Sequence, residues 1–273
     1  MLEVESVSPE HFLWNFSERV AIVAAHPDDE VIGAGGHLPQ LRDAVFIHVT
    51  NGAPRNSRDA AVAGFSSPQE YARARAQELA SALKLAGIDP GNRQPMGMVD
   101  QEASYHLCRL TRSLIDLLRE NRTDVVLTHP YEGGHPDHDA TAFSVRAACG
   151  ILKKQGARFP RIVEFTSYHA RDGHLIAGEF LPDESDPGNG EITVDLSAEM
   201  RDLKRRMFDC YVTQRHVLQL FPIHSERFRP APVYHFNSPP HAGPLHYERF
   251  DWGITGEQWR GLAFDAAREL GLD

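Results

Sequence analysis

Short apolar runs alternate with longer amphipathic stretches through the first 170 residues, and this alternation limits the fold more than any other feature. The runs at 19–25 (RVAIVAA) and 44–50 (AVFIHVT) have the length and residue types of buried strands. A helix is expected between them, at 31–41. Strands that alternate with helices form βαβ units, which build parallel sheets covered by helices. The sequence therefore predicts an α/β fold, a Rossmann-like layered structure with a mostly parallel sheet flanked by helices.

The pattern continues further along the chain but with two interruptions. Helices are expected at 67–86, 107–121, 136–155 and 197–208, and strands at 124–128, 162–168 and 192–196. Residues 172–191 are acidic and contain proline and glycine, so we expect a surface loop there. Residues 221–252 mix Pro, His, Arg and aromatic residues without periodicity, and the aromatic content favours an ordered, irregular lobe over a flexible tail. We expect one domain over 1–273, with a core at 1–170 and a loop, a helix and an irregular substrate-side lobe at 171–273.

Composition excludes several classes of partner. The chain has 273 residues and a formal net charge of −10, so it lacks the basic surface with which nucleic-acid-binding proteins hold phosphates. No apolar run reaches the ~18 residues that would suggest a membrane span, and the first ten residues are acidic, unlike a secretory signal. Cys108, Cys149 and Cys210 are too far apart to form a thiolate metal motif. We expect a cytoplasmic protein with no nucleic-acid partner and no membrane insertion, and homo-oligomer formation stays open.

The first chemical signal follows the first expected strand directly and reads His26-Pro27-Asp28-Asp29-Glu30. Ligands of open parallel sheets bind beyond the carboxyl ends of the strands, so these residues stand where a site is expected. A neutral imidazole and a carboxylate, here His26 and Asp29, suit a divalent metal such as zinc. Asp28 points elsewhere and is free to act as a base. The alternative is a polar cap of the following helix, but a cap needs neither a histidine nor two consecutive aspartates.

The second signal follows the strand expected at 124–128 and reads HPYEGGHPDH over 129–138. His135 and His138 are three residues apart at the start of a helix, so both can face the same crevice. Asp137 is placed to hydrogen-bond one imidazole and fix its tautomer. Gly133 and Gly134 are expected to leave room for a ligand near the backbone. Alone, such a histidine pair could be a surface cluster; next to the first motif this alternative becomes weak.

These two motifs, AHPDDE and HPDH, closely resemble those of the LmbE-like or PIG-L family of zinc-dependent N-deacetylases. The resemblance covers about the first 170 residues. It implies a Rossmann-like fold, a Zn²⁺ cofactor, for which Fe²⁺ would also suit the ligands, and hydrolysis of an acetamide on an N-acetylglucosamine unit.

The resemblance also implies residue roles. Carried over by position, the metal ligands are His26, Asp29 and His138. Asp28 is then the general base, His135 stabilises the oxyanion, and Asp137 orients His135.

Three further residues are weaker candidates for substrate binding. Arg75 stands in Arg75-Ala-Gln-Glu78, which resembles the R-x-x-E of the family, and Asp100 ends a Met-Val-Asp element like one that binds a sugar hydroxyl. An exposed ion pair and an ordinary loop aspartate are the alternatives. Some relatives place a tyrosine two residues before HPDH, but Gly133 stands there in this chain. Either Tyr131 covers the site instead, or this role is absent.

The function expected from the resemblance is metal-dependent removal of an N-acetyl group from an N-acetylglucosamine-type sugar or glycoconjugate, which yields acetate and a free amine. One alternative keeps the same machinery but cleaves another acyl amide or an S-conjugate. A second is a non-catalytic sugar-binding module, which would be expected to have lost the base or a metal ligand.

Overall fold

A six-stranded, mostly parallel sheet forms the centre of the computed structural model, which describes residues 17–182 and 190–272. From edge to edge its strands are β2 (Val45–His48), β1 (Val20–Ala24), β5 (Val125–Thr128), β6 (Arg161–Phe165), β10 (Ser225–Pro230) and β9 (Ile192–Asp195). Strands β2, β1, β5 and β6 pair in parallel, whereas β10 is antiparallel to both of its neighbours. The predicted α/β class and mostly parallel sheet are confirmed.

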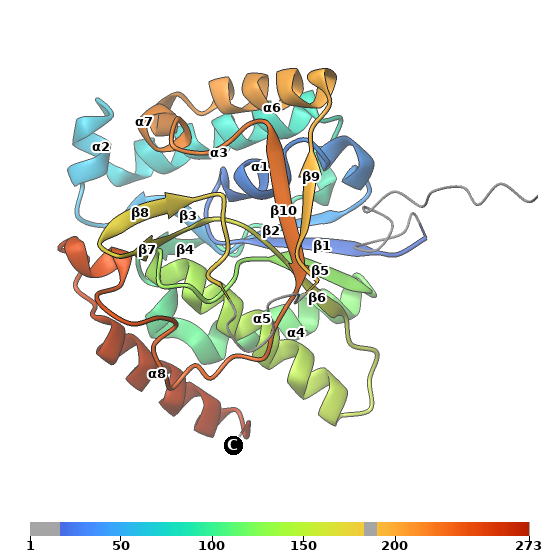
Figure 1. The fold of residues 1–273 in the computed structure, drawn as a ribbon, viewed down its shortest axis with the longest axis vertical. Coiled ribbons are helices and arrows are strands. Elements are labelled where there is room, and N and C mark those ends of the chain that lie inside the picture. Colours follow the sequence, from blue (N-terminus) through green and yellow to red (C-terminus); the bar gives the residue numbers. More distant parts are fainter. Residues whose placement is uncertain (1–16, 183–189, 273) are drawn as a thin grey trace, which may run out of the picture.

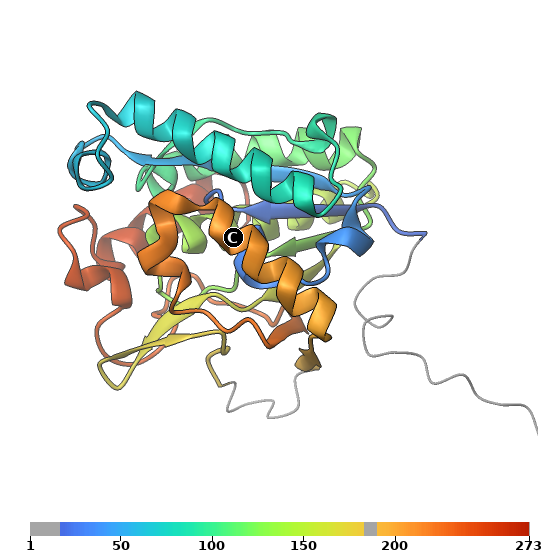
Figure 2. The same cartoon turned by 90° about the horizontal axis from the view of Figure 1, so that it is seen from above.

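Helices cover both faces of this sheet (Figure 1). One layer contains α1 (Asp29–Ala34), α3 (Pro68–Leu85) and α6 (Ala198–Cys210), and the other contains α4 (Leu107–Glu120), α5 (Pro136–Lys154) and α8 (Gly256–Glu269). Figure 2 shows α3 and α6 side by side on the first layer. Alternate residues of β1 serve the two cores: Val20 and Ile22 pack with the first layer, Ala21 and Val23 with the second. This two-sided burial explains why the strand is apolar at every position.

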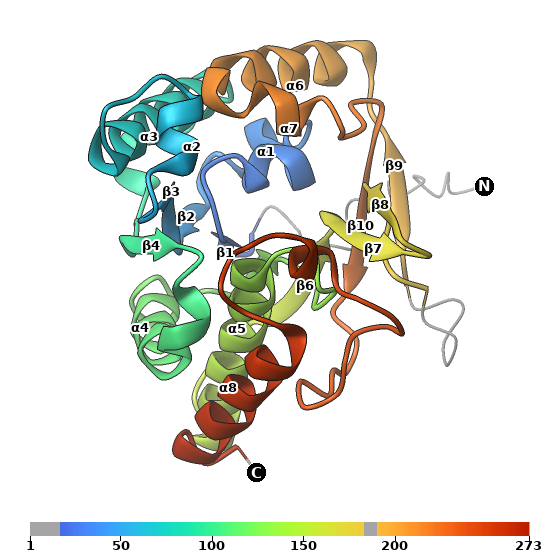
Figure 3. The same cartoon turned by 90° about the vertical axis from the view of Figure 1, so that its left-hand side faces the viewer.

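Smaller elements gather at the end of the sheet where β1 and β5 finish (Figure 3). They are the pair β3 (Thr50–Pro54) and β4 (Met98–Asp100), the hairpin β7 (Tyr168–Arg171) and β8 (His174–Ala177), and the short helices α2 (Arg58–Val62) and α7 (Arg215–Leu218). Every helix among residues 17–182 and 190–272 is too short or too polar to cross a membrane.

Several expected boundaries are wrong. The strands expected at 44–50 and 162–168 each divide, because the chain leaves the central sheet and pairs elsewhere as β3 and β7. The loop expected at 172–191 contains the strand β8. Residues 183–189 of this expected loop lie outside the residues that the structure describes. The helix expected at 31–41 ends at Ala34 and is followed by a 3₁₀ turn at Leu38–Leu41, since glycines at 33, 35 and 36 disfavour a continuous helix.

The irregular lobe expected at 221–252 contains β10, a strand of the central sheet. The strand is hard to recognise because two of its buried side chains are charged: Glu226 pairs with Lys204 at 2.7 Å and Arg229 with Glu164 at 2.8 Å. The core therefore does not end at residue 170. Because β9 and β10 come from the second part of the chain and complete the sheet, we infer a single domain.

Candidate active site

Three side chains converge where β1 ends and α5 begins, and together they can hold a metal ion. Asp29 contacts both histidines: Oδ2 lies 3.2 Å from Nδ1 of His26, and Oδ1 lies 3.2 Å from Nε2 of His138. The two imidazole nitrogens are also 3.2 Å apart. Ligands at 2.0–2.1 Å from a tetrahedral zinc ion are about 3.3 Å from one another, so these donors already have the spacing of such a site.

The chemistry of this group fits a catalytic zinc ion. Two imidazole nitrogens and one carboxylate are typical of sites that keep a position open for water or substrate, and ferrous iron accepts the same donors. The hydroxyl of Ser167 lies 3.3 Å from Nδ1 of His138, so it can fix the tautomer that leaves Nε2 available. All three donors are at least nine-tenths buried.

The far nitrogen of His26 faces two further carboxylates. Nε2 lies 3.2 Å from Oδ1 of Asp100 and 3.4 Å from Oδ2 of Asp137. A proton on Nε2 would bond these oxygens and leave Nδ1 free for a metal, which is the usual arrangement of a carboxylate behind a metal-bound histidine. Asp100 and Asp137 therefore support His26.

This placement corrects the expected role of Asp137. Its carboxylate accepts hydrogen bonds from the backbone N–H groups of Gln101 (2.6 Å) and Ala103 (3.0 Å) and faces His26. Only the backbone N–H of Asp137 reaches His135, where it donates to Nδ1 at 3.1 Å. The reason is helix geometry. His135 is the N-cap of α5, and its ring accepts a hydrogen bond from the backbone N–H of Asp137, the second helical residue.

The same backbone bond defines what His135 can do. Because Nδ1 accepts a hydrogen bond, the neutral ring carries its proton on Nε2, which lies 3.8 Å from Asp100. Burial, and the neighbouring His26, lower the pKa of His135 well below 6.5. His135 therefore offers an N–H donor from a neutral ring. It lies close enough to His26, Asp100 and Asp137 to form a second group of metal-ligand type, but its protonated Nε2 makes it a poor ligand.

Asp28 occupies the turn between β1 and α1 in a backbone conformation that non-glycine residues rarely adopt, with φ 121° and ψ −28°. Its backbone N–H donates to Glu30 (3.1 Å), which is also bound by His48 and by the hydroxyl of Tyr211. Strain of this kind persists when surrounding bonds enforce it and is concentrated at functional sites. Burial raises the pKa of Asp28 well above 3.8, although the adjacent Arg75 opposes the shift.

Arg75 holds Asp28 in place. Its guanidinium donates to the Asp28 carboxylate (3.1 Å) and to the backbone carbonyls of Pro27 (2.6 Å) and Gly52 (2.9 Å). The side chain is 4% exposed, so the alternative of an exposed ion pair is wrong. Glu78, its partner in the R-x-x-E motif, instead binds the backbone and hydroxyl of Thr213.

Tyr131 lies in an aromatic cluster of the core. Its ring stacks on Trp259, with centroids 5.2 Å apart, and its hydroxyl donates to the carbonyl of Ser238 at 2.9 Å. With 3% of its surface exposed, Tyr131 packs the C-terminal segment against the site loop. These contacts correct the expectation that Tyr131 covers the substrate.

The glycines of the site loop serve packing. A side chain at Gly133 would collide with Leu245, and one at Gly134 with the carbonyl oxygen of Tyr168. The space that we expected to admit a ligand is thus occupied by the C-terminal segment and by β7.

Several residues of the site were not singled out from the sequence. His129 stacks on His138 with centroids 4.1 Å apart and accepts a hydrogen bond from the backbone of Ala25, and burial lowers its pKa to about 4. The position of His129 directly after β5 could have identified it as a residue of the site. Tyr168 and Trp252, whose rings contact His138 and His135, were also not singled out, although Trp252 belongs to the aromatic segment 221–252 that was expected on the substrate side.

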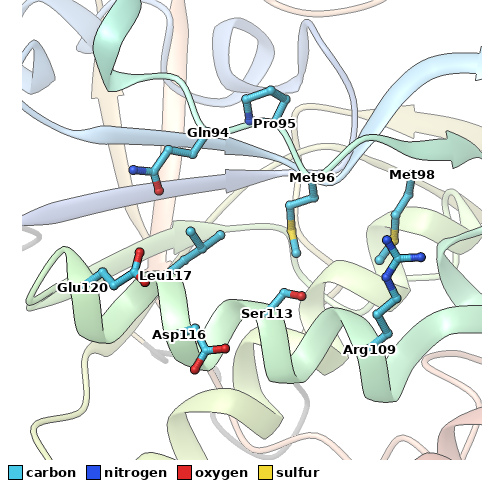
Figure 4. Close-up of a pocket in the computed structure, with 9 residues that line it drawn as sticks. All are labelled: Gln94, Pro95, Met96, Met98, Arg109, Ser113, Asp116, Leu117 and Glu120. Atoms are coloured by element: carbon cyan, nitrogen blue, oxygen red, sulfur yellow. The ribbon is translucent and has the colours of Figure 1, made fainter.

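A surface cavity of about 290 Å³ lies elsewhere, between the approach to β4 and helix α4 (Figure 4). Its lining shares no residue with the metal group and brings no histidine or cysteine. The histidine and aspartate cluster therefore remains the candidate active site.

Comparison with known proteins identifies a family to which the chain is similar. The model of the PIG-L family, described as GlcNAc-PI de-N-acetylase, matches residues 21–149, which include every candidate metal ligand. A diacetylchitobiose deacetylase of Thermococcus kodakarensis is 29% identical over 138 residues, 48% of each chain. A 1D-myo-inositol 2-acetamido-2-deoxy-alpha-D-glucopyranoside deacetylase of Corynebacterium glutamicum is 30% identical over 209 residues, 67% of this chain and 69% of the relative.

Solved structures agree on the fold. A deacetylase of the teicoplanin biosynthesis pathway superposes with a TM-score of 0.59 and 16% identity, over 78% of this chain and 97% of that one. The 4-carboxy-2-hydroxymuconate hydratase GalB of Pseudomonas putida KT2440 superposes with a TM-score of 0.55 and 16% identity, over 80% of this chain and 99% of that one. The same fold thus occurs in a deacetylase and in a hydratase, so the reaction has to be argued from the residues of the site. By its match to the family model and its identity with the Corynebacterium relative, the chain belongs to the PIG-L family.

Proposed function

We propose that this protein is a metal-dependent de-N-acetylase that removes the acetyl group of an N-acetylglucosamine-type sugar or glycoconjugate. One observation carries the proposal: a metal-ligand group of His26, Asp29 and His138 lies beside a strained, arginine-held Asp28 and an N–H donor on His135. The names of both curated relatives support an acetamido sugar as substrate.

The residues that would hold the ion are His26, Asp29 and His138. When bound, a zinc ion supplies Lewis-acid polarisation of the acetyl carbonyl and lowers the pKa of water. Asp100 and Asp137 orient His26 for this task, and Ser167 orients His138.

Asp28 takes a proton from the attacking water and passes it to the nitrogen of the leaving amine as the C–N bond breaks. A carboxylate whose pKa is raised by burial is better matched to this exchange near neutral pH than an ordinary aspartate. Arg75 keeps the carboxylate aimed at the site. His135 donates its Nε2–H to the carbonyl oxygen, which gains negative charge in the transition state.

The test is incubation of the metal-loaded protein with N-acetylated glucosamine derivatives, followed by mass spectrometry for loss of acetyl and by assay of acetate. We expect acetate release that stops on chelation and returns when zinc or ferrous ion is added. Release of longer acyl groups or cleavage of S-conjugates in preference to acetamido sugars would support the other amidase activity. Sugar binding without acetyl loss by the metal-loaded protein would show a non-catalytic module.

A further inference from the structure

The segment that follows α6 packs beside the proposed base, although the two are far apart along the chain. Helix α6 ends at Cys210, and the next four residues, Tyr211-Val-Thr-Gln214, form a short 3₁₀ turn that we call the 211–214 turn. Tyr211 is fully buried and Gln214 is 9% exposed, whereas Val212 between them is 62% exposed. The turn therefore encloses two polar side chains and leaves an apolar one in solvent.

Helix α3 anchors this turn. The Glu78 carboxylate accepts hydrogen bonds from the backbone N–H of Thr213 at 2.9 Å and from its hydroxyl at 2.6 Å. Two bonds from one residue to a carboxylate fix both the backbone and the side chain of that residue. The same helix carries Arg75, about one turn earlier, so the 211–214 turn is fixed to the element that holds Asp28.

Tyr211 reaches the backbone of the base through one other residue. Its hydroxyl donates to Oε1 of Glu30 at 2.6 Å, and Oε2 of Glu30 accepts from the backbone N–H of Asp28 at 3.1 Å and faces His48 at 3.0 Å. All of these side chains are buried. The Asp28 backbone, at φ 121°, persists in a strained conformation only where its surroundings enforce it. Tyr211 contributes by fixing the second oxygen of the carboxylate that binds this backbone.

Gln214 reaches the side chain of the base by a second route. Its Nε2 donates to the hydroxyl of Tyr71 at 2.6 Å. Tyr71 and Arg75 are four residues apart on α3, and the guanidinium carbon of Arg75 lies 6.0 Å from the centre of the Tyr71 ring. Arg75 donates to Oδ2 of Asp28 at 3.1 Å. Gln214 thus supports the carboxylate of Asp28, whereas Tyr211 supports its backbone.

We propose that the 211–214 turn positions the catalytic base, and that Tyr211 and Gln214 are its positioning residues. The inference rests on the proposed function, in which Asp28 exchanges a proton with water and with the leaving amine. Such exchange requires hydrogen-bond reach, and a displacement of about 1 Å can cost about 10²-fold in rate. The two side chains bond Glu30 and Tyr71, which are not candidate metal ligands. The turn should therefore affect the base and leave metal binding unchanged.

The main test is Tyr211→Phe, which removes the hydroxyl and keeps the ring that fills the core. With N-acetylglucosamine as substrate of the zinc-loaded enzyme, we expect kcat to fall about 10- to 100-fold, with KM and metal content unchanged. The matched control is Tyr131→Phe, which removes another buried tyrosine hydroxyl, bonded to the carbonyl of Ser238. Equal losses of kcat in the two variants, or loss of metal from Tyr211→Phe, would overturn the proposal.

The second variant is Gln214→Met, which keeps the length of the side chain and removes its amide. We expect kcat to fall about two- to tenfold, the range of one neutral hydrogen bond, with KM unchanged. Gln219→Met is the control, because Gln219 is exposed and bonds only the nearby carbonyl of His216 among the residues that the structure describes. A raised KM at unchanged kcat in Gln214→Met would make Gln214 a substrate contact and overturn its positioning role.

Combination with Asp28→Asn separates an effect on the base from general support of the site. Residues that act as a unit show non-additive losses. In the Asp28→Asn background the basicity is already absent, so Tyr211→Phe should lower the remaining rate by less than about twofold. The same fractional loss with and without Asp28→Asn would show that Tyr211 does not act through Asp28.

Hydrogen exchange at the backbone amide of Asp28, followed by NMR, reports the positioning without any reaction. Tyr211→Phe should speed this exchange about tenfold or more, the factor for one hydrogen bond to a charged group, and Tyr131→Phe should not. Faster exchange in a protein whose parent form releases no acetate would support the positioning and refute the proposed function. Acetate release, with kcat and exchange both unaffected by Tyr211→Phe, would support the function and refute the positioning.

Discussion

The guanidinium of Arg75 donates to the carboxylate of Asp28 across 3.1 Å, and both side chains are almost fully enclosed. Arg75 comes from the middle of α3, and Asp28 from the turn after β1. A buried charge pair of this kind is expensive to break because the remaining charge has no partner. The pair therefore fixes the position of the proposed base before any substrate arrives.

The Asp28→Asn variant should lose about 10²–10⁴-fold in kcat, because the amide keeps the size of the side chain and removes its basicity. Metal content should stay at one equivalent. Steady-state kinetics and elemental analysis check both points. If Asp28→Asn loses the metal while Asp29→Asn keeps it, the two aspartates have the opposite roles.

The Arg75→Lys variant distinguishes positioning of the base from contact with substrate. Lysine keeps the charge but cannot reproduce the bonds to Asp28, Pro27 and Gly52 together. We expect kcat to fall about 10- to 100-fold, as for a misplaced catalytic group, with little change in KM. A raised KM at unchanged kcat would instead identify Arg75 as a substrate contact.

The His138→Ala variant should bind no stoichiometric metal and keep its fold, since helices and sheet do not depend on the ion. Ser167→Ala, which removes the partner of the other imidazole nitrogen, should weaken metal affinity about 10- to 100-fold. Competition with a chromogenic chelator measures the affinity, and circular dichroism checks the fold. Tightly held metal in His138→Ala would refute the ligand assignment.

The pair His135→Ala and Asp137→Asn tests the corrected role of Asp137. His135→Ala should retain metal and lose about 10²–10³-fold in kcat, as when an oxyanion donor is removed. Asp137→Asn should weaken metal binding, because the carboxylate faces His26. An Asp137→Asn protein with normal metal affinity and reduced kcat would restore the role expected from the sequence.

The buried strand β10 offers a test of stability with an internal control. Arg229→Met removes the buried guanidinium that pairs with Glu164 and Glu132 and should lower the free energy of unfolding by about 3–5 kcal/mol. Arg227→Met, two residues earlier, breaks a pair with Glu191 whose side chains are both 33% exposed, and should cost at most about 1 kcal/mol. Urea denaturation followed by circular dichroism measures both. An equal loss of unfolding free energy in the two variants would mean that the buried ion pairs of Arg229 stabilise the fold no more than the exposed pair of Arg227.

The sequence by itself was sufficient to predict the parallel strands of the sheet and to place the candidate site at the carboxyl ends of β1 and β5. Strands β1 and β5 are short, apolar runs, and each is followed at once by a motif that contains histidine and aspartate. Because parallel strands end at one edge of a sheet, His26 and His138 could be expected to meet although they are more than a hundred residues apart.

Only the tertiary structure decided the surroundings of those residues. Whether Asp137 faces His26 or His135 depends on where the backbone of Gln101 lies, and the burial of Arg75 depends on the packing of α3 against β3. Strand β10 was not recognised because its charged side chains find partners on distant segments. Such pairings leave no periodic trace along the chain, since their energy comes from contacts between segments brought together by folding.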